Sequence, residues 1–297
     1  MHMITKRRFA IGASAVFVGC AATGWHDEAP AASWAETLSS ELARLEWESG
    51  GRLGVAVLDT LTGAQAGHRA GERFPLCSTF KLLAVAAMLA RVDAGQARLD
   101  RLVKFDASDV VVNSPATKDR VGNPGMALEE LCEAAMTLSD NTAGNLLLAA
   151  LGGPARLTAY ARSLGDIVTR LDRIEPELNE AMPGDPRDTT SPAAMLSNVR
   201  TLVLGNALSA QSRDRLIGWL VGNKTGDARL RAGLPNTWRV GDKTGSGERG
   251  TTNDVGIVWP PGRAPIVISA YLTGTSAPAA QRNATLAAVG RAVAATL

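Results

Sequence analysis

Apolar residues recur with helical or strand spacing at both ends of the chain. From Trp34 to Glu48, large apolar residues return every three or four positions, which predicts an amphipathic helix. The segment from Arg52 to Thr60 is rich in Val and Leu and is predicted to be a strand, and a Thr62-Gly63 turn leads into a second strand from Gln65 to Arg69. The fold is therefore expected to start with a helix and a β-hairpin.

The middle of the chain has a different pattern. Residues 78–221 are mostly helical in character, with Pro and Gly breaks at 122–125, 152–154 and 183–186. Strands return near the C-terminus, and a last helix is expected from about Pro278. The predicted strands are Thr237 to Lys243, Thr252 to Trp259 and Ile266 to Thr273.

Strands at both ends around a helical middle predict a two-domain protein of the α/β (α+β) class. We expect a mixed sheet built from both chain ends with flanking helices, plus an inserted all-helical domain. The expected α/β domain comprises residues 32–70 and 222–297, the helical domain comprises 71–221, and the active site lies between them.

Residues 1–31 have the order of an export signal. Basic residues at 6–8 precede an apolar run from Phe9 to about Ala22, and small residues follow around position 30. The run is too short and alanine-rich for a stable membrane span. We expect an exported protein, periplasmic or secreted, with a twin-arginine signal as one route and lipidation at Cys20 as a less favoured one.

Composition narrows the function further. The chain has 297 residues, of which 45% are hydrophobic, and its net charge of +2 comes from 31 basic and 29 acidic residues spread along the sequence. No broad basic patch suited to nucleic acid is expected. His68 is the only histidine after the leader, and no metal or phosphate-binding motif occurs, so we expect no metal and no cofactor.

Ser78 and Lys81 stand three residues apart at the start of an apolar helix of about four turns, which begins at Phe80. This spacing lets the amine approach the hydroxyl, and a partly desolvated lysine can activate a serine nucleophile. An N-capping serine beside a lysine that extends to solvent would give the same pattern. The pair alone therefore leaves catalysis open.

Three more polar segments interrupt the apolar pattern. Ser139-Asp140-Asn141 lies between two helical runs, and Lys243-Thr244-Gly245 lies at the end of a predicted strand; each is also compatible with an ordinary cap or turn. The charged, proline-broken segment 173–190 has the character of a functional loop, although a solvated surface loop would look similar. In it, Glu175 and Asn179 could hold and deprotonate a water, and Arg173 and Asp188 could pair to close the loop.

In this order, the four motifs are those of class A β-lactamases, with Glu-Pro-Glu-Leu-Asn at 175–179 as the most specific element. The sequence resembles this family along essentially all of its length after the leader. The resemblance implies an antibiotic-resistance hydrolase that opens small-molecule β-lactams through a serine acyl-enzyme. It also implies a monomer.

The resemblance assigns the catalytic roles. Ser78 would attack the lactam carbonyl, and its proton would pass to Lys81 or, through a water, to Glu175, a choice that is disputed for the family. Ser139 would protonate the departing ring nitrogen. Glu175 and Asn179 would position the water that hydrolyses the ester, with Glu175 as general base.

Substrate contacts also follow by similarity. Asn141 would bind the acylamino side chain, while Lys243, Thr244 and Ser246 would bind the carboxylate. The N–H groups of Ser246 and of the nucleophile would form the oxyanion hole. Arg229 matches one of the two places where the family carries an arginine beside that carboxylate.

Some positions depart from the family pattern. Asn113 stands where an aromatic residue is usual. Cys77 matches a cysteine of carbapenem-hydrolysing members, but Gly247 stands where those members have the partner cysteine. Cys132 matches one half of another family disulfide, and Val85 stands at the position of its other half. Spacing alone leaves cysteine pairing open, and we expect both thiols to be free and buried. We expect turnover of penicillins and cephalosporins, with carbapenems left open.

Two alternatives share the serine, lysine and Lys-Thr-Gly chemistry. A cell-wall D,D-peptidase would deacylate slowly, and the Glu175 and Asn179 pair disfavours it because such enzymes lack this water-activating step. A penicillin-sensing domain would stay acylated, but such sensors usually continue into a membrane span, and no apolar stretch of sufficient length follows the leader.

Overall fold

The computed structural model describes residues 1–2 and 30–296. A five-stranded sheet organises the molecule, in the order β2-β1-β9-β8-β7. Its strands are β1 (Arg52–Asp59), β2 (Gln65–His68), β7 (Arg239–Ser246), β8 (Thr252–Trp259) and β9 (Ile266–Thr273). The sheet is therefore built from both chain ends, as the sequence predicted.

Every neighbouring pair in this sheet is antiparallel, so the expectation of a mixed sheet was wrong. Short connections join β1 to β2, β7 to β8 and β8 to β9, and such hairpin turns can join only antiparallel strands. The remaining pair, β1 with β9, is also antiparallel, with Arg52 opposite Thr273 and Asp59 opposite Ile266.

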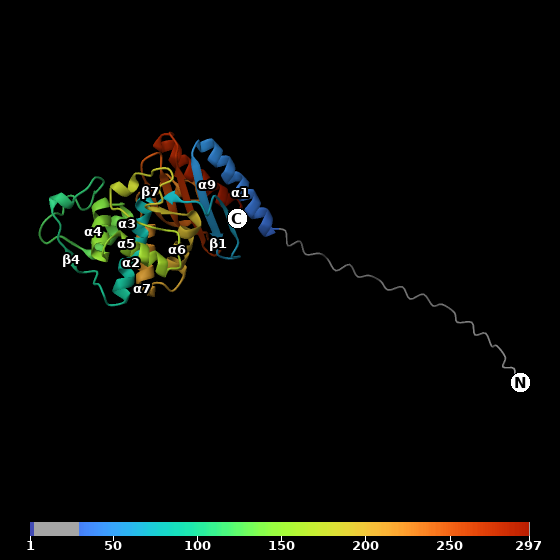
Figure 1. The fold of residues 1–297 in the computed structure, drawn as a ribbon, viewed down its shortest axis with the longest axis horizontal. Helices are drawn as coiled ribbons and strands as arrows, with labels where there is room; N and C mark the ends of the chain where they lie inside the picture. Colours follow the sequence, from blue (N-terminus) through green and yellow to red (C-terminus); the bar gives the residue numbers. More distant parts are fainter. Residues whose placement is uncertain (3–29, 297) are drawn as a thin grey trace.

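The two faces of the sheet contact different helices. Along β1, Leu53, Val55 and Val57 pack with α1 (Pro30–Ser49) and α9 (Ala279–Thr296), while Ala56 and Leu58 face the other core. Figure 1 shows α1 and α9 together on one side of the sheet, away from the helical body. The fold is thus layered, with the catalytic motifs on the side of the helical body.

Residues between β2 and β7 form that helical body. Its helices are α2 (Phe80–Asp93), α3 (Leu128–Thr137), α4 (Asn141–Leu151), α5 (Pro154–Ser163), α6 (Pro192–Leu204) and α7 (Ala210–Val221). The short helix α8 (Leu230–Gly233) packs instead against α9, on the other side of the sheet. Helix α2 runs through the centre of the helical body, where every residue from Phe80 to Leu89 is buried.

The inserted region is not all-helical, contrary to expectation. Strand β3 (Phe74–Pro75) pairs with β6 (Thr189–Thr190), and β4 (Leu102–Val103) pairs with β5 (Met126–Ala127). Each strand has only two residues, too few for a side-chain pattern to indicate a strand in the sequence. The β3–β6 pair matters for the site because it fixes both the segment before Ser78 and the end of the 173–190 loop.

The expected export leader falls almost entirely on residues 3–29, which lie outside the described residues. Within the described part, no helix has both the length and the apolar character needed to cross a membrane.

Candidate active site

Ser78 lies in η1 (Cys77–Thr79), a single 3₁₀ turn that leads directly into α2. The segment before it is fixed from three directions: Leu76 N donates to Asp188 O (2.8 Å), and Leu76 O accepts from Thr79 Oγ1 (2.7 Å) and Asn253 Nδ2 (3.1 Å). The Ser78 side chain therefore has a rigid base, which favours precise positioning of a nucleophile.

Lys81 reaches Ser78, as the spacing predicted. Its Nζ lies 2.7 Å from Ser78 Oγ and 2.8 Å from Glu175 Oε1. Further oxygens around the amine are Asn141 Oδ1 (2.7 Å) and Ser139 O (3.1 Å). Gly144 makes room for this side chain, because a Cβ there would lie 2.7 Å from Lys81 Cε.

Glu175 faces the same two groups from the 173–190 loop. Its Oε1 also accepts from Ser78 Oγ (3.2 Å), and its Oε2 accepts from Asn179 Nδ2. The side chain of Glu175 is fully buried, as is that of Lys81. One carboxylate oxygen therefore contacts both the hydroxyl and the amine.

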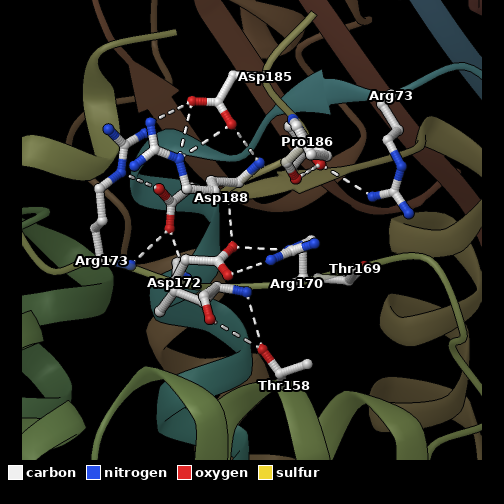
Figure 2. Close-up of polar contacts among 12 residues, drawn as sticks. Arg73, Thr158, Thr169, Arg170, Asp172, Arg173, Asp185, Pro186 and Asp188 are labelled. Atoms are coloured by element: carbon white, nitrogen blue, oxygen red, sulfur yellow. Dashed lines mark hydrogen bonds and ion pairs between the residues drawn. The ribbon is translucent and has the colours of Figure 1, made fainter. Parts of the chain in front are cut away.

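The two ends of the 173–190 loop are tied together, which confirms the predicted ion pair. Asp188 Oδ2 accepts from Arg173 Nε (2.6 Å), and its Oδ1 accepts from the backbone N–H groups of Asp172 (2.7 Å) and Arg173 (2.9 Å). Asp172 accepts in return from Asp188 N (3.1 Å). Figure 2 shows these carboxylates at the neck of the loop, with Arg170 paired to Asp172.

Ser139 and Asn141 lie in the turn between α3 and α4, opposite the nucleophile. Ser139 Oγ accepts from Lys243 Nζ (2.9 Å), so Ser139 contacts both lysines of the site. Asp140 holds the turn: it caps α4 through Ala143 N (2.8 Å) and also accepts from Thr117 N (3.0 Å) and Thr117 Oγ1. The middle residue of the motif is thus structural.

Lys243, Thr244 and Gly245 lie within β7, and not in a turn at its end, because the strand continues to Ser246 opposite Thr252. Lys243 is fully buried, and its Nζ also donates to Thr244 O (2.9 Å). Thr244 Oγ1 contacts Thr225 Oγ1 (2.5 Å).

The side chain of Arg229 lies against the C-terminal end of β7. Its Nη2 donates to Ser246 Oγ (2.7 Å), and its Nη1 donates to Gly245 O (2.8 Å) and Asn253 O (2.6 Å). Its Nε donates to Asn283 Oδ1 (3.1 Å). A guanidinium has five N–H groups, so these four bonds leave one Nη2 hydrogen available.

A cavity of about 600 Å³ opens in front of these groups. The predicted site residues that line it are Ser78, Ser139, Asn141, Asn179, Arg229, Thr244 and Ser246. Lys81, Glu175 and Lys243 lie behind this lining and contact it through the bonds given above. Asn113 also lines the cavity, with a φ of 61°, where the family would carry an aromatic side chain.

Burial lowers the pKa values of the two lysines of the site, Lys81 and Lys243. Burial lowers the pKa of Lys81, although Glu175 raises it. Burial, followed by the charges of Lys81 and Arg229, lowers the pKa of Lys243 well below its ordinary value. Lys81 is therefore suited to accept a proton, and an anion placed beside Lys243 would favour the charged form of that lysine.

Cys77 and Cys132 are free and buried. A Cβ at Gly247 would lie 2.6 Å from Cys77 Sγ, so the two positions face each other as the resemblance implied. Burial raises the pKa of both thiols, which keeps them protonated. Among the residues that the structure describes, no three His, Cys, Asp or Glu side chains gather as a metal site would require.

Two positioning residues were missed in the sequence. Asn145 binds both backbone groups of Glu175: its Oδ1 accepts from Glu175 N (2.9 Å) and its Nδ2 donates to Glu175 O (2.9 Å). Its place four residues after Asn141 on an apolar helix was the available signal. Asn253 ties β8 to the segment before the nucleophile through Pro75 O (2.9 Å), a contact across 178 positions that sequence spacing does not indicate.

A serine hydroxyl held between a buried lysine and a buried glutamate, facing a cavity with a cationic end, defines a serine hydrolase that works through an acyl-enzyme. The model of the β-lactamase enzyme family matches residues 37–297. The chain therefore belongs to the β-lactamase enzyme family, and its relatives place it in class A.

The relatives cover most of the chain. β-Lactamase CTX-M-8 of Citrobacter amalonaticus is 49% identical over 265 residues, which are 89% of this chain and 91% of the relative. β-Lactamase AST-1 of Nocardia asteroides is 52% identical over 251 residues, or 84% and 81% of the two chains. An ancestral class A β-lactamase structure is 64% identical and has a TM-score of 0.86, covering 88% of this chain and all 100% of the other.

A further solved structure agrees. The putative class A β-lactamase PenP from Rhodopseudomonas palustris is 60% identical with a TM-score of 0.86, covering 88% of this chain and 99% of that one. The predicted family and fold class are thereby confirmed.

Proposed function

We propose that this class A β-lactamase uses Ser78 as nucleophile and Glu175 as the base of deacylation. The observation that carries the proposal is the position of Glu175 Oε1, within 2.8 Å of Lys81 Nζ and 3.2 Å of Ser78 Oγ. A carboxylate at this distance from both groups can exchange protons with each of them during the two half-reactions.

In acylation, Ser78 Oγ bonds to the lactam carbonyl carbon and the ring C–N bond breaks. The hydroxyl proton passes to Lys81 or, through a water, to Glu175. Burial lowers the pKa of Lys81, which supports the first route. Ser139 delivers a proton to the departing nitrogen and regains one from Lys243, whose Nζ donates to Ser139 Oγ.

In deacylation, a water attacks the ester carbonyl carbon while Glu175 takes its proton. The ester C–O bond breaks, and the proton returns to Ser78 Oγ. Asn179 orients the carboxylate through Oε2, and Asn145 fixes the backbone of Glu175. The N–H groups of Ser78 and Ser246 form the oxyanion hole in both steps.

The substrates are penicillins and cephalosporins, which carry the carboxylate that the cationic end of the cavity fits. Lys243, Thr244, Ser246 and Arg229 bind that carboxylate, supported by their place at one end of the cavity or directly behind it. Asn141 binds the acylamino group. No metal or cofactor enters these steps.

We also infer the organisation and location of the protein. Residues 32–70 with 222–297 form an α/β domain and residues 71–221 a helical domain, supported by the contribution of β7 on one side of the cavity and α4 on the other. The leader, residues 1–31, directs export to the periplasm or the medium, through the twin-arginine route or, less favourably, with lipidation at Cys20. The enzyme acts as a monomer.

The test is turnover of a penicillin by the parent protein and by Glu175→Ala, followed by mass spectrometry. We expect many turnovers in the parent and an accumulating acyl-enzyme on Ser78 in the variant. Glu177→Ala is the matched control, because Glu177 is exposed on the same loop and should deacylate normally. A parent that stalls after one acyl group per chain would refute the proposal and indicate a peptidase or a sensor.

A further inference from the structure

A second cavity, of about 470 Å³, lies at the other end of the 173–190 loop. Its walls come from loop residues 181–186, from Arg73 before β3, from the ends of β1 and β9, and from Arg249 in the turn between β7 and β8. It shares no lining residue with the catalytic cavity. Its volume lies in the usual range for small-molecule sites, about 300–1,000 Å³.

The charges around this cavity are unbalanced. Its two carboxylates already have arginine partners: Glu72 pairs with Arg52 (3.1 Å), and Asp185 pairs with Arg187 (2.6 Å). Two other guanidinium groups, those of Arg73 and Arg249, have only neutral partners among the described residues.

The geometry of these two arginines leaves donors for a ligand. Arg73 Nη1 donates to Val168 O (2.9 Å) and Thr189 Oγ1 (3.0 Å), and within the described part of the chain these bonds leave Nη2 and Nε open. Among the residues with described positions, Arg249 Nη2 contacts only the sulfur of Met182 (2.7 Å). Figure 2 shows Arg73 beside the loop at Pro186, whose carbonyl accepts from Thr189 Oγ1 (2.6 Å).

The remaining lining is largely apolar, with Pro75, Ala181, Met182, Pro183 and Pro186. Guanidinium groups bind carboxylates through paired N–H donors, and flat apolar surfaces favour an aromatic body. We propose that this cavity is a second ligand site, separate from the catalytic one, that takes a small amphipathic anion such as an aromatic carboxylate.

A ligand in this cavity would contact the 173–190 loop on the side away from the catalytic cavity. The cavity wall at 181–186 begins two residues after Asn179 in the loop. Glu248 N donates to Asn179 O (2.9 Å), and the next residue, Arg249, accepts from Gly274 N (2.8 Å). A ligand held by Arg249 and the loop therefore bridges the two segments that position Asn179.

The test is an NMR titration of the ¹⁵N-labelled protein with naphthalene-2-carboxylate. We expect saturable shifts of the Ala181, Gly184, Arg249 and Gly274 amides, separate from any shifts at 244–246, where the catalytic cavity can also bind a carboxylate. Naphthalene-2-carboxamide, the neutral isostere, should bind the second site at least tenfold more weakly.

Arginine variants complete the design. Arg73→Gln and Arg249→Gln should each weaken binding at the second site at least tenfold, while Arg98→Gln, an exposed arginine elsewhere on the surface, should not. Shifts confined to 244–246, or an unchanged Kd in the Arg73→Gln/Arg249→Gln double variant, would overturn the proposal. Thermal unfolding of each variant verifies that it is folded.

Discussion

Arg229 offers a prediction whose size follows from its hydrogen bonds. Four of its five N–H groups are bonded within the protein, to Ser246, Gly245, Asn253 and Asn283, and one Nη2 hydrogen remains. If that hydrogen binds the substrate carboxylate, Arg229→Ala removes one charge-assisted hydrogen bond. Such a bond contributes about 1.5–3 kcal/mol.

This free energy corresponds to a decrease of about 10- to 150-fold in kcat/KM for a penicillin, since about 1.4 kcal/mol is a factor of ten. The loss should fall mainly on KM if the bond is equally strong before and during reaction. The assay is steady-state hydrolysis followed by the absorbance of the lactam, with parent and variant side by side.

Arg229→Ala also removes the bonds that the guanidinium donates to the backbone carbonyls of Gly245 and Asn253, so a control must separate this structural effect. The methyl ester of the same penicillin lacks the anionic carboxylate but retains the lactam. The variant should therefore lose much less activity on the ester than on the acid. Equal losses on both substrates, or an unchanged KM for the acid, would refute the assignment. Arg282→Gln, which removes bonds to Thr252 and Ala277 outside the cavity, is the matched control.

Further predictions concern stability and the thiols. Asp188→Asn should lower the free energy of unfolding by about 3 kcal/mol in urea, because it breaks a buried ion pair. Asp100→Asn, at an exposed pair, should have a much smaller effect, and equal losses would contradict the role of the loop neck. Burial raises the pKa of Glu46, but bonds from Arg69, His68 and Leu53 N outweigh it and hold the pKa at about 2, below its ordinary 4.5. The stability that this carboxylate provides is present above pH 4.5 and is lost as the pH falls towards 2, so Glu46→Gln should flatten the pH dependence of unfolding in that window; an unchanged slope would count against it. Thiol titration of the denatured, leaderless protein without reductant should find two thiols, from Cys77 and Cys132, and finding none would show a disulfide.

The strands show where sequence patterns were sufficient. Strands β8 and β9 have the predicted bounds, and half of the residues in each are Val, Ile or aromatic. Strand β7 continues three residues past its predicted end, through Thr244, Gly245 and Ser246. Polar residues and glycine have weak strand propensity, and only the pairing with β8 shows that they belong to the sheet.

In the site, too, local contacts could be predicted from the sequence and long-range contacts could not. The three-residue spacing of Ser78 and Lys81 predicted their contact because helix geometry is local. The meeting of Lys81 with Glu175, 94 positions apart, rested on family resemblance, since no local pattern indicates it. The roles of Asn145 and Asn253 were missed for the same reason: each side chain acts on a backbone segment that only the tertiary fold brings near.

The place of β1 inside the sheet, between β2 and β9, has a consequence for folding order. One of its two neighbours is β9, the last strand of the chain, and Thr275 donates to Ser49 O across 226 positions. During synthesis, β1 therefore stays without that partner until nearly the whole polypeptide has left the ribosome. Long-range pairings of this kind slow folding because a large loop must close first. The nascent chain should thus remain incompletely folded, and exposed to chaperones and proteases, until its final residues are made.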